Sequence, residues 1–502
     1  MQPIHRFLAL LTIAAAIGIH AQPASKRTLT LEECIQMALL HNLDLQIQRY
    51  VPEIARFNLS GAYAAYDPTF NGLVRQSFSA SESGFNPNAF NPPSNETWLE
   101  QYEAGVGGTA PTGLRYDLFG NVDRSSGEVA AGNPPVLTDV GFDYRTRVGI
   151  NLTQPLLKNF WIDAPRLQIA LSKRNLKISE LSLRQLVMTT VTSVETVYYN
   201  LIFAQENVKV QEKALELAER LLAENKKRVE VGALAPLDEK QAQSEVAARK
   251  ADLLTAQRDL QTQQNTLKSL LTDDYSSWHP VYIDPAAGLT APSYAVQLQD
   301  SWEKGLTLRP DLLQSRLTLE MQNIQLKYDR NQLFPQLDLL GSFGYTGRDT
   351  DINPALGDIG SQRNPNHSAG IQLTIPFSNR AARNSYKASK ARKEQAILNL
   401  KKLEQSIMVQ IDENVGQVKT SFERVDATKQ ARMFAEEALD AEEKKLANGK
   451  STSFEVLRLQ RDLTAARSAE IRALADYNVA LANLAASEGT TLERNRIDME
   501  VK

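Results

Sequence analysis

The chain has 502 residues, of which 42% are apolar and 23% are charged, and its formal net charge is −3. This charge is too small to indicate nucleic-acid binding, and no basic run with interleaved aromatic residues occurs, so no nucleic-acid partner is expected. The length alone would accommodate about three ordinary domains.

The N-terminus has the pattern of a secretory signal peptide. His5 and Arg6 precede an apolar run over residues 7–19, and Ala21 is followed by a suitable cleavage site. We therefore predict a signal peptide over residues 1–21. Cys34 is the single cysteine of the chain, so an intrachain disulfide is excluded, and we expect it to fill apolar space. No later stretch reaches the roughly 18 apolar residues of a transmembrane helix.

Two short helices are predicted within residues 28–66, the first opened by a capping box from Thr30 to Glu33. Residues 67–156 then change to a period of two, which predicts strands. Around residue 145 one face is apolar and the other carries Asp143, Arg145 and Arg147. This alternation fits a one-sided soluble sheet or a membrane barrel with a wet lumen. The signal peptide and the aromatic residues near strand ends favour the barrel.

Residues 160–271 are predicted to form a long helical hairpin. Aliphatic residues recur every seven positions along its first helix, which is on the order of 100 Å long at about 1.5 Å per residue. Such a repeat predicts left-handed supercoiling against partner helices. The seam comprises Val187, Val194, Leu201, Val208, Leu215, Leu222 and Val229. The turn spans residues 231–238, with Gly232 at its start and Asp238 where a carboxylate favours the helix N-terminus.

The whole plan then repeats. The motif that ends in Asp44-Leu45 recurs at Asp311-Leu312 with an offset of 267 residues, and Gly149 recurs at Gly370 with an offset of 221. Residues 272–333 are therefore predicted as a connector and second pair of short helices, residues 334–378 as a second β-hairpin, and residues 379–486 as a second helical hairpin. Its turn spans residues 447–455 and contains Gly449 and Glu455, and a polar tail follows over residues 487–502.

The offset between the two halves falls from 267 to 221 within the β region. This difference predicts an insertion of about 46 residues in the first half. It should include a hairpin from Tyr102 to Phe119 that turns at residues 111–113. By contrast, an ordinary polar loop is expected between the two strands of the second half.

The ordered repeat and its two glycine-to-acidic turns resemble the TolC-type outer-membrane efflux family over residues 28–490. The resemblance implies an α+β membrane protein: a homotrimer whose outer-membrane β-barrel continues into a periplasmic α-helical barrel. It further implies a location in the outer membrane of a Gram-negative-type bacterium, with a long periplasmic portion. The implied partners are a periplasmic adaptor, an inner-membrane transporter and outer-membrane lipid. Asp143, Arg145 and Arg147 would then face the barrel lumen.

The insertion leaves the strand count open between twelve and eighteen per trimer. We expect twelve, with the additional hairpin outside the barrel, because a wider barrel would mismatch the helical duct.

The same resemblance assigns the turns to the periplasmic aperture. The acidic positions of the family fall on Asp238 and Glu455, whereas Arg458 stands where a second acidic residue is common. Three copies of Glu455 would form a negative ring that favours cations; alternatively, Asp238 and Glu455 only stabilise helix N-termini. Leu446 and Ser451 occupy the positions of the tyrosine and arginine that latch neighbouring helices in the family.

No catalytic motif, metal-ligand spacing or cofactor loop is present in the sequence, so we expect neither an enzyme nor a cofactor. The favoured function is a passive exit duct of a tripartite efflux or type I secretion system. The alternative is a periplasmic coiled-coil scaffold or adaptor without a membrane barrel.

Overall fold

The computed structural model describes residues 26–82, 94–131, 136–232, 234–293 and 295–498. The predicted signal peptide lies outside this part of the chain. The described residues form two compact units: unit 1 contains those within 26–46, 187–298 and 412–498, and unit 2 contains the others. Two very long helices, α3 (Ala164–Glu230) and α9 (Arg380–Ala447), contribute residues to both units.

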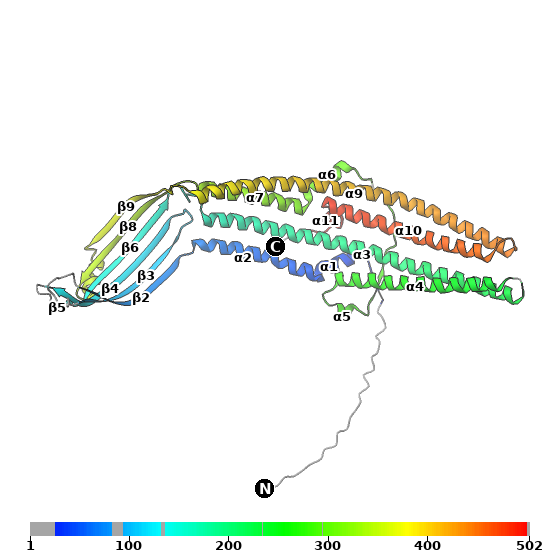
Figure 1. The fold of residues 1–502 in the computed structure, drawn as a ribbon, viewed down its shortest axis with the longest axis horizontal. Helices are drawn as coiled ribbons and strands as arrows, with labels where there is room; N and C mark the ends of the chain where they lie inside the picture. The colour runs from blue at the N-terminus through cyan, green and yellow to red at the C-terminus, as the bar shows by residue number, and fades with distance from the viewer. Residues whose placement is uncertain (1–25, 83–93, 132–135, 233, 294, 499–502) are drawn as a thin grey trace, which may run out of the picture. The chain divides into compact units, whose positions relative to one another are not determined.

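Unit 1 is a bundle built on the distal parts of α3 and α9 and the helices that return from them. Figure 1 shows the two hairpins, α3 with α4 and α9 with α10, running side by side. Its other elements are β1 (Lys26–Leu29), α1 (Leu31–His41), α4 (Pro236–Leu271), α5 (Tyr275–Trp278), β7 (Tyr282–Pro285), α10 (Ser453–Glu488) and α11 (Thr491–Arg494).

A small parallel sheet of β1 and β7 packs against this bundle. The side chain of Gln264 on α4 accepts from the backbone N–H of Ile283 at 3.0 Å and donates to its carbonyl oxygen. The buried Tyr198 on α3 donates its hydroxyl to the carbonyl of Leu29 at 3.1 Å. The capping box predicted for α1 is confirmed, because the Thr30 hydroxyl accepts from the Glu33 N–H and the Glu33 carboxylate accepts from the Thr30 N–H.

The seam of α3 is only partly regular. Its first four residues, from Val187 to Val208, are buried, whereas Leu215, Leu222 and Val229 are half-buried. Towards the turn the buried positions are instead Ala214, Ala218, Leu221 and Asn225. A helix of 3.6 residues per turn drifts relative to a strict seven-residue repeat. Towards the turn, the buried positions therefore lie one residue before the predicted ones, for example Leu221 in place of Leu222.

Unit 2 contains a single large sheet and the helices next to it. Its strands run in the order β2-β3-β4-β6-β8-β9, every pairing is antiparallel, and β5 pairs with β4. The strands are β2 (Thr69–Glu82), β3 (Ser94–Thr109), β4 (Arg115–Ala131), β5 (Val136–Asp139), β6 (Asp143–Pro155), β8 (Gln336–Asp349) and β9 (Pro365–Thr374). The helices are α2 (Leu43–Tyr63), η1 (Ala64–Tyr66), α6 (Leu298–Leu308), α7 (Pro310–Asn331) and α8 (Ile352–Gly360), with the proximal parts of α3 and α9.

The structure corrects our expectation for the insertion. The predicted hairpin is present as β3 and β4, and Gly113 turns it with a left-handed φ of +86°. However, both strands lie inside the sheet, between β2 and β6, and not outside it. The reason is that β3 and β4 carry the same alternation as their neighbours, so both of their faces continue the faces of the sheet.

A second correction concerns the segment between β8 and β9. We expected an ordinary polar loop, whereas the segment contains the helix α8. The side chain of Asp351 caps this helix by accepting from the N–H of Asn353 at 3.1 Å.

Candidate functional site

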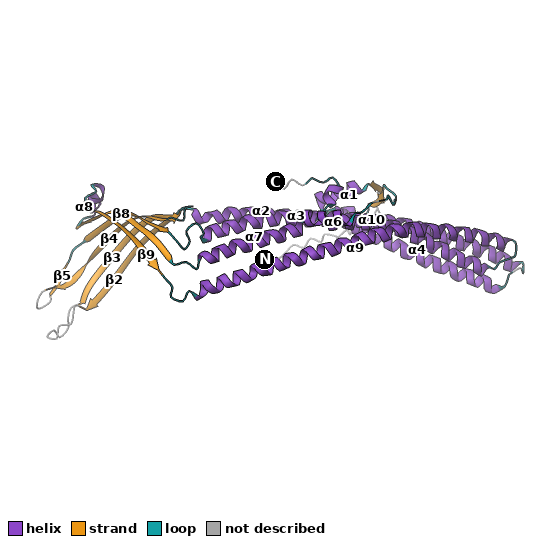
Figure 2. Ribbon diagram, turned by 90° about the horizontal axis from the view of Figure 1, so that it is seen from above, coloured by secondary structure: helices purple, strands orange, loops and turns teal. Residues whose placement is uncertain are grey.

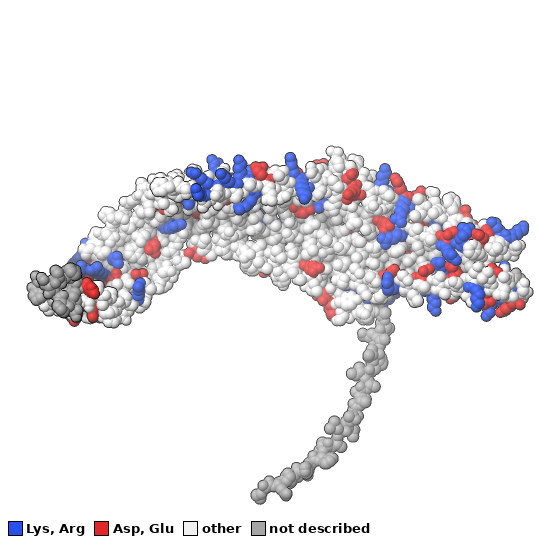
Figure 3. Space-filling model, viewed as in Figure 1, with Lys and Arg blue, Asp and Glu red and all other residues white. Residues whose placement is uncertain are grey.

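The turns of the two helical hairpins form the candidate site in unit 1. Gly232 ends α3 with φ +79°, and Gly449 follows α9 with φ +68°. A left-handed backbone at the end of a helix is unfavourable for residues with a Cβ, so glycine at these two positions fixes where the chain reverses. On the face shown in Figure 3, charged side chains are dense around the turns and sparse over the strands of unit 2.

Asp238 stabilises the start of α4. Its carboxylate accepts from the backbone N–H of Ala235, the N-cap residue, at 3.2 Å. Alanine has no side-chain acceptor for a backbone N–H. The carboxylate of Asp238 is therefore the side chain that caps this helix N-terminus. This contact supports the helix N-terminus interpretation for Asp238.

Glu455 makes a different contact. The hydroxyl of Thr452 caps α10 by accepting from the N–H of Glu455, and the carboxylate of Glu455 instead pairs with Arg458. Nε and Nη2 of Arg458 both donate to Oε2 of Glu455, at 3.0 and 2.8 Å. The neighbouring carboxylate raises the pKa of Arg458. Arg458 also lies 3.5 Å from the carboxylate of Asp462. Arg458 therefore compensates part of the negative charge at this position, which weakens the expected negative ring.

Leu446 and Ser451 lie at the α9–α10 turn. Leu446 is buried in an apolar cluster with residues from α3, α9 and α10 that includes Leu221 and Val456. The hydroxyl of Ser451 donates to the carboxylate of Glu442, which also pairs with Lys445 at 2.9 Å. These hydrogen bonds hold the pKa of Glu442 below its ordinary value. Ser451 thus stabilises the turn of its own hairpin, whereas Leu446 packs between the two hairpins.

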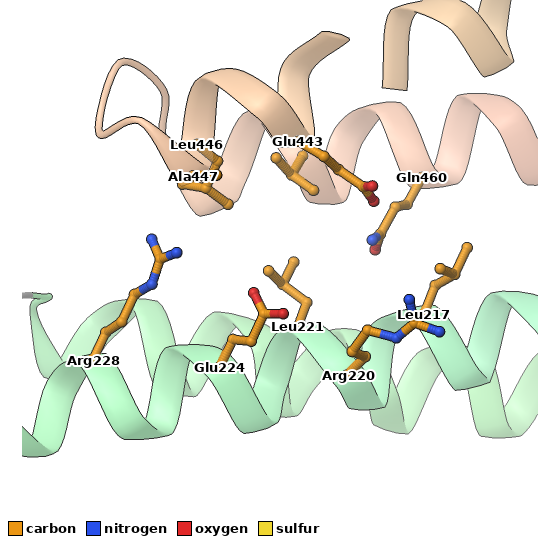
Figure 4. Close-up of a pocket in the computed structure, with 10 residues that line it drawn as sticks. Leu217, Arg220, Leu221, Glu224, Arg228, Glu443, Leu446, Ala447 and Gln460 are labelled. Carbon is orange, nitrogen blue, oxygen red and sulfur yellow. The ribbon is translucent and has the colours of Figure 1, made fainter. Parts of the chain in front are cut away.

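A groove of about 200 Å³ lies between the two hairpins close to their turns. Its lining combines apolar side chains, such as Leu217, Leu221 and Val456, with charged side chains from α3 and α9. Figure 4 shows Glu224 and Arg228 extending from α3 towards the side that carries Leu446 and Ala447 on α9, whereas Arg220 runs along α3 beside Leu217. We call this feature the tip groove.

Polar contacts between the hairpins were not predicted from the sequence. Ser453 donates to the side-chain oxygen of Asn225 at 2.9 Å, and both residues are buried. Glu245 on α4 pairs with Arg461 on α10 at 2.9 Å. In the sequence, these contacts are indicated only by a polar residue at an otherwise apolar helical position, such as Asn225. The partner of Asn225 cannot be identified in this way, because it is 228 residues away in the sequence.

The predicted lumen residues lie together on the polar face of the sheet. Arg145 and Arg348 are cross-strand neighbours, and both donate to the carboxylate of Asp143, at 3.0 and 2.7 Å. Arg147 pairs with Asp123 at 3.1 Å. Among the described residues no group of three metal-ligating side chains occurs, and none of the helices in the same ranges has the length and apolarity needed to cross a membrane.

Sequence comparison identifies the family. The chain matches the outer membrane efflux protein family over residues 118–272 and 303–490. It belongs to this family. Outer membrane protein TolC of Escherichia coli is 21% identical over 312 residues, which cover 61% of this chain and 62% of that protein. Outer membrane protein TolC of Vibrio cholerae is 24% identical over 356 residues, which cover 70% of this chain and 78% of that protein.

Comparison of structures agrees with this assignment. The outer-membrane channel OprN has the same fold, with a TM-score of 0.68, 17% identity, and coverage of 98% of this chain and 99% of OprN. The chain is therefore an outer membrane efflux protein whose fold is that of the α+β outer-membrane channels. The identified relatives are outer-membrane proteins, in agreement with the predicted location.

Proposed function

We propose that three copies of this chain form a passive exit duct that carries substrates from the periplasm across the outer membrane. The observation that carries the proposal is the antiparallel sheet, in which the six consecutively paired strands have β2 at one edge and β9 at the other. In a bilayer every backbone polar group needs a partner, so an open sheet of this size is viable there only when neighbouring subunits pair its edges.

The strand directions favour closure between identical subunits. An even number of antiparallel strands places β2 and β9 in opposite directions, so the β9 of one chain can pair antiparallel with the β2 of the next. Three chains would then form a closed barrel of eighteen strands. This replaces the expected twelve, because β3 and β4 are integral members of the sheet.

The composition of the two faces supports a polar lumen. The face that carries Asp143, Arg145 and Arg147 also contains a row of register partners, Gly105, Phe119, Gly149 and Gly344. A Cβ on Gly149 would lie 3.1 Å from the Phe119 ring and 2.8 Å from the carbonyl oxygen of Phe343. Such glycines favour the curvature that closes a sheet with this face inside.

The hairpin turns are the proposed periplasmic end of the duct. The tip groove is lined by both apolar and charged side chains, which suits a helical hairpin that presents an apolar stripe flanked by charges. We therefore propose that a periplasmic adaptor docks there and couples the duct to an inner-membrane transporter. The duct itself supplies no energy. We propose that it opens when the paired helices move at the turns.

Covalent trapping of the barrel seam tests the proposal. Asn71→Cys on β2 and Gln372→Cys on β9 place thiols on the polar face near the helix-proximal ends of the two edge strands. Oxidised membranes should yield a covalent trimer only when both substitutions are present. The matched control pairs Asn71→Cys with Asn151→Cys on the central strand β6, which should give no trimer. The purified trimer should also produce stepwise single-channel conductance in planar bilayers. A soluble periplasmic monomer without conductance would instead support the scaffold alternative.

A further inference from the structure

We propose that α8 is an interfacial helix, which lies on the outside of the barrel and inserts its apolar side among the outer-leaflet acyl chains. This inference rests on the proposed barrel. It assigns to α8 a lipid-binding surface that fixes how deeply the outer end of the sheet sits in the membrane.

The helix is held against the apolar face of the sheet. Thr146 on β6 and Gly347 on β8 are register partners on this face, alongside Val148 and Tyr345. The buried Thr146 donates its hydroxyl to the carbonyl oxygen of Ala355 in α8 at 2.8 Å. Ala355 itself is 0% exposed. The contact places α8 on the face opposite the polar lumen residues (Figure 2).

Glycine at residue 347 is required for this contact. A Cβ built on Gly347 would lie 1.9 Å from the carbonyl oxygen of Ala355, far inside any real contact distance. The backbone of α8 therefore touches the backbone of β8 directly. Such a close approach indicates a specific docking site and not a loop that happens to rest on the sheet.

The position along the strands matches the outer boundary of a bilayer. β9 has 10 residues, and its first residue, Pro365, pairs with Tyr345. A transmembrane strand needs about 9–11 residues, so the paired part of β8 and β9 already spans the hydrocarbon core. Gly347 and the helix docked on it lie immediately beyond that span, on the side away from the long helices.

The outward surface of α8 continues the apolar surface of the sheet. Phe343 on β8 and Ile371 on β9 are exposed on the same face as the docking site. On α8, Ile352 and Leu356 are four residues apart, share one side of the helix, and are 37% and 45% exposed. Asp351 and Asp358 stand near its two ends, where they can remain in water. This combination is typical of a helix that lies in the membrane interface.

Depth-dependent fluorescence quenching tests the inference. A bimane label on Leu356→Cys is measured in trimers reconstituted into phosphatidylcholine vesicles that carry a nitroxide on acyl carbon 5 or 12. We expect at least two-fold stronger quenching by the carbon-5 lipid than by the carbon-12 lipid. Pro354→Cys, two residues away and thus on the opposite side of the helix, is the matched control and should be quenched weakly by both lipids. Cys34, the single cysteine of the parent chain, is buried and should not react with the label. The parent chain therefore serves as the unlabelled control.

Two further labels separate this inference from the barrel itself. Phe343→Cys on the apolar face should be quenched by the carbon-12 lipid, whereas Ser342→Cys on the polar face should not. If the label at 343 is quenched and the label at 356 is not, the interfacial role of α8 is overturned and the barrel stands. If the label at 343 is also unquenched, the proposed barrel orientation fails. A benzophenone at position 356 that cross-links two chains would show that a neighbouring subunit covers α8, which also contradicts the lipid contact.

Discussion

Arg461 on α10 and Glu245 on α4 form an ion pair that joins the two helical hairpins of unit 1. Nε and Nη2 of Arg461 lie 3.0 and 2.9 Å from Oε2 of Glu245. The Glu245 side chain is only 8% exposed, and its other oxygen accepts from Nε of Arg249 at 2.9 Å. One buried carboxylate therefore bridges two guanidinium groups from different hairpins, and Arg249 also pairs with Asp252 at 3.0 Å. Loss of the carboxylate would remove the bridge between the hairpins.

We predict that Glu245→Gln weakens the packing between the hairpins by about 1–3 kcal/mol, since the buried side of the pair is lost and the half-exposed Arg461 keeps no carboxylate on α4. In the proposed duct this loosens the tip, so the closed channel should open more often in planar bilayers. Glu206→Gln removes an exposed ion pair with Lys209 and should leave the open probability unchanged. Equal behaviour of the two variants would contradict a role for Glu245 in holding the hairpins together.

The pair formed by Glu455 and Arg458 leads to a prediction about ion selectivity. Because Arg458 offsets the charge of Glu455 within one chain, the unmodified channel should show a weaker cation preference than a ring of unpaired carboxylates. Arg458→Gln should expose three carboxylates near the axis and increase the cation-to-anion permeability ratio several-fold. Glu455→Gln should shift the ratio in the opposite direction. Reversal potentials in a salt gradient measure both effects, and two unchanged potentials would mean that these residues lie away from the ion path.

The repeat made much of the fold predictable. The offsets between the halves located β2, β6, β8 and β9, because each pair of equivalent strands shares a local motif. The internal alternation of β3 and β4 was equally readable, with Tyr102 and Val122 on the apolar face and Gln101 and Asp123 on the polar face. Our expectation for them was nevertheless wrong, because it was drawn from the assumed width of the duct and not from the alternation.

The missed features depend on contacts that are distant in sequence. The docking of α8 depends on the close approach at Gly347 and on the hydrogen bond from Thr146 to Ala355, and neither Gly347 nor Thr146 indicates a helix in the sequence. The contact between Asn225 and Ser453 is of the same kind. At the turns, the position of Glu455 was predictable from the sequence, but its partner was not. Whether its carboxylate contacts Arg458 or the helix N-terminus depends on side-chain conformation.

The buried seam of α3 yields a stability prediction. Leu201 is fully buried in unit 1, so Leu201→Asp places an unpaired carboxylate in the core and should cost at least about 3 kcal/mol. We expect loss of the trimer on mild-detergent gels and degradation in cells. Lys209→Asp, on an exposed position of the same helix, should cost about 1 kcal/mol or less. A stable trimer of the Leu201 variant would contradict its place in the packed wall.

Two glycines of the second hairpin should respond to alanine in opposite directions. Gly449 has φ +68°, so Gly449→Ala should destabilise the turn by about 1–2 kcal/mol, and Gly449→Asn should cost less. Gly416 lies inside α9, and a Cβ added there would have no neighbouring atom within 4 Å, so Gly416→Ala should stabilise the helix by about 0.5–1 kcal/mol. Thermal melts followed by circular dichroism compare the variants. A neutral Gly449→Ala would show that the turn can reverse without a left-handed residue.

The buried carboxyl of Glu195 on α3 gives a pH-dependent prediction. Glu195 is 1% exposed, and Nδ2 of Asn495 donates to its Oε1 at 3.3 Å, whereas Oε2 has no partner among the described residues. Burial raises its pKa, although Arg494 and Asn495 partly oppose the shift. The folded state therefore holds this proton more tightly than the unfolded state, so stability should fall as pH rises from the ordinary carboxyl range through the raised pKa.

In Glu195→Gln the amide oxygen can still accept the hydrogen bond from Asn495, and the residue no longer titrates. Relative to the wild type, the variant should therefore gain stability as pH rises, by about 1–3 kcal/mol at pH 8. The gain should shrink towards pH 4.5, because the wild-type carboxyl is then protonated and resembles the amide. Melting temperatures across this range measure the effect, and Glu212→Gln at an exposed position of α3 should show no such trend. A stabilisation that does not vary with pH would mean that packing, and not the charge of Glu195, is responsible.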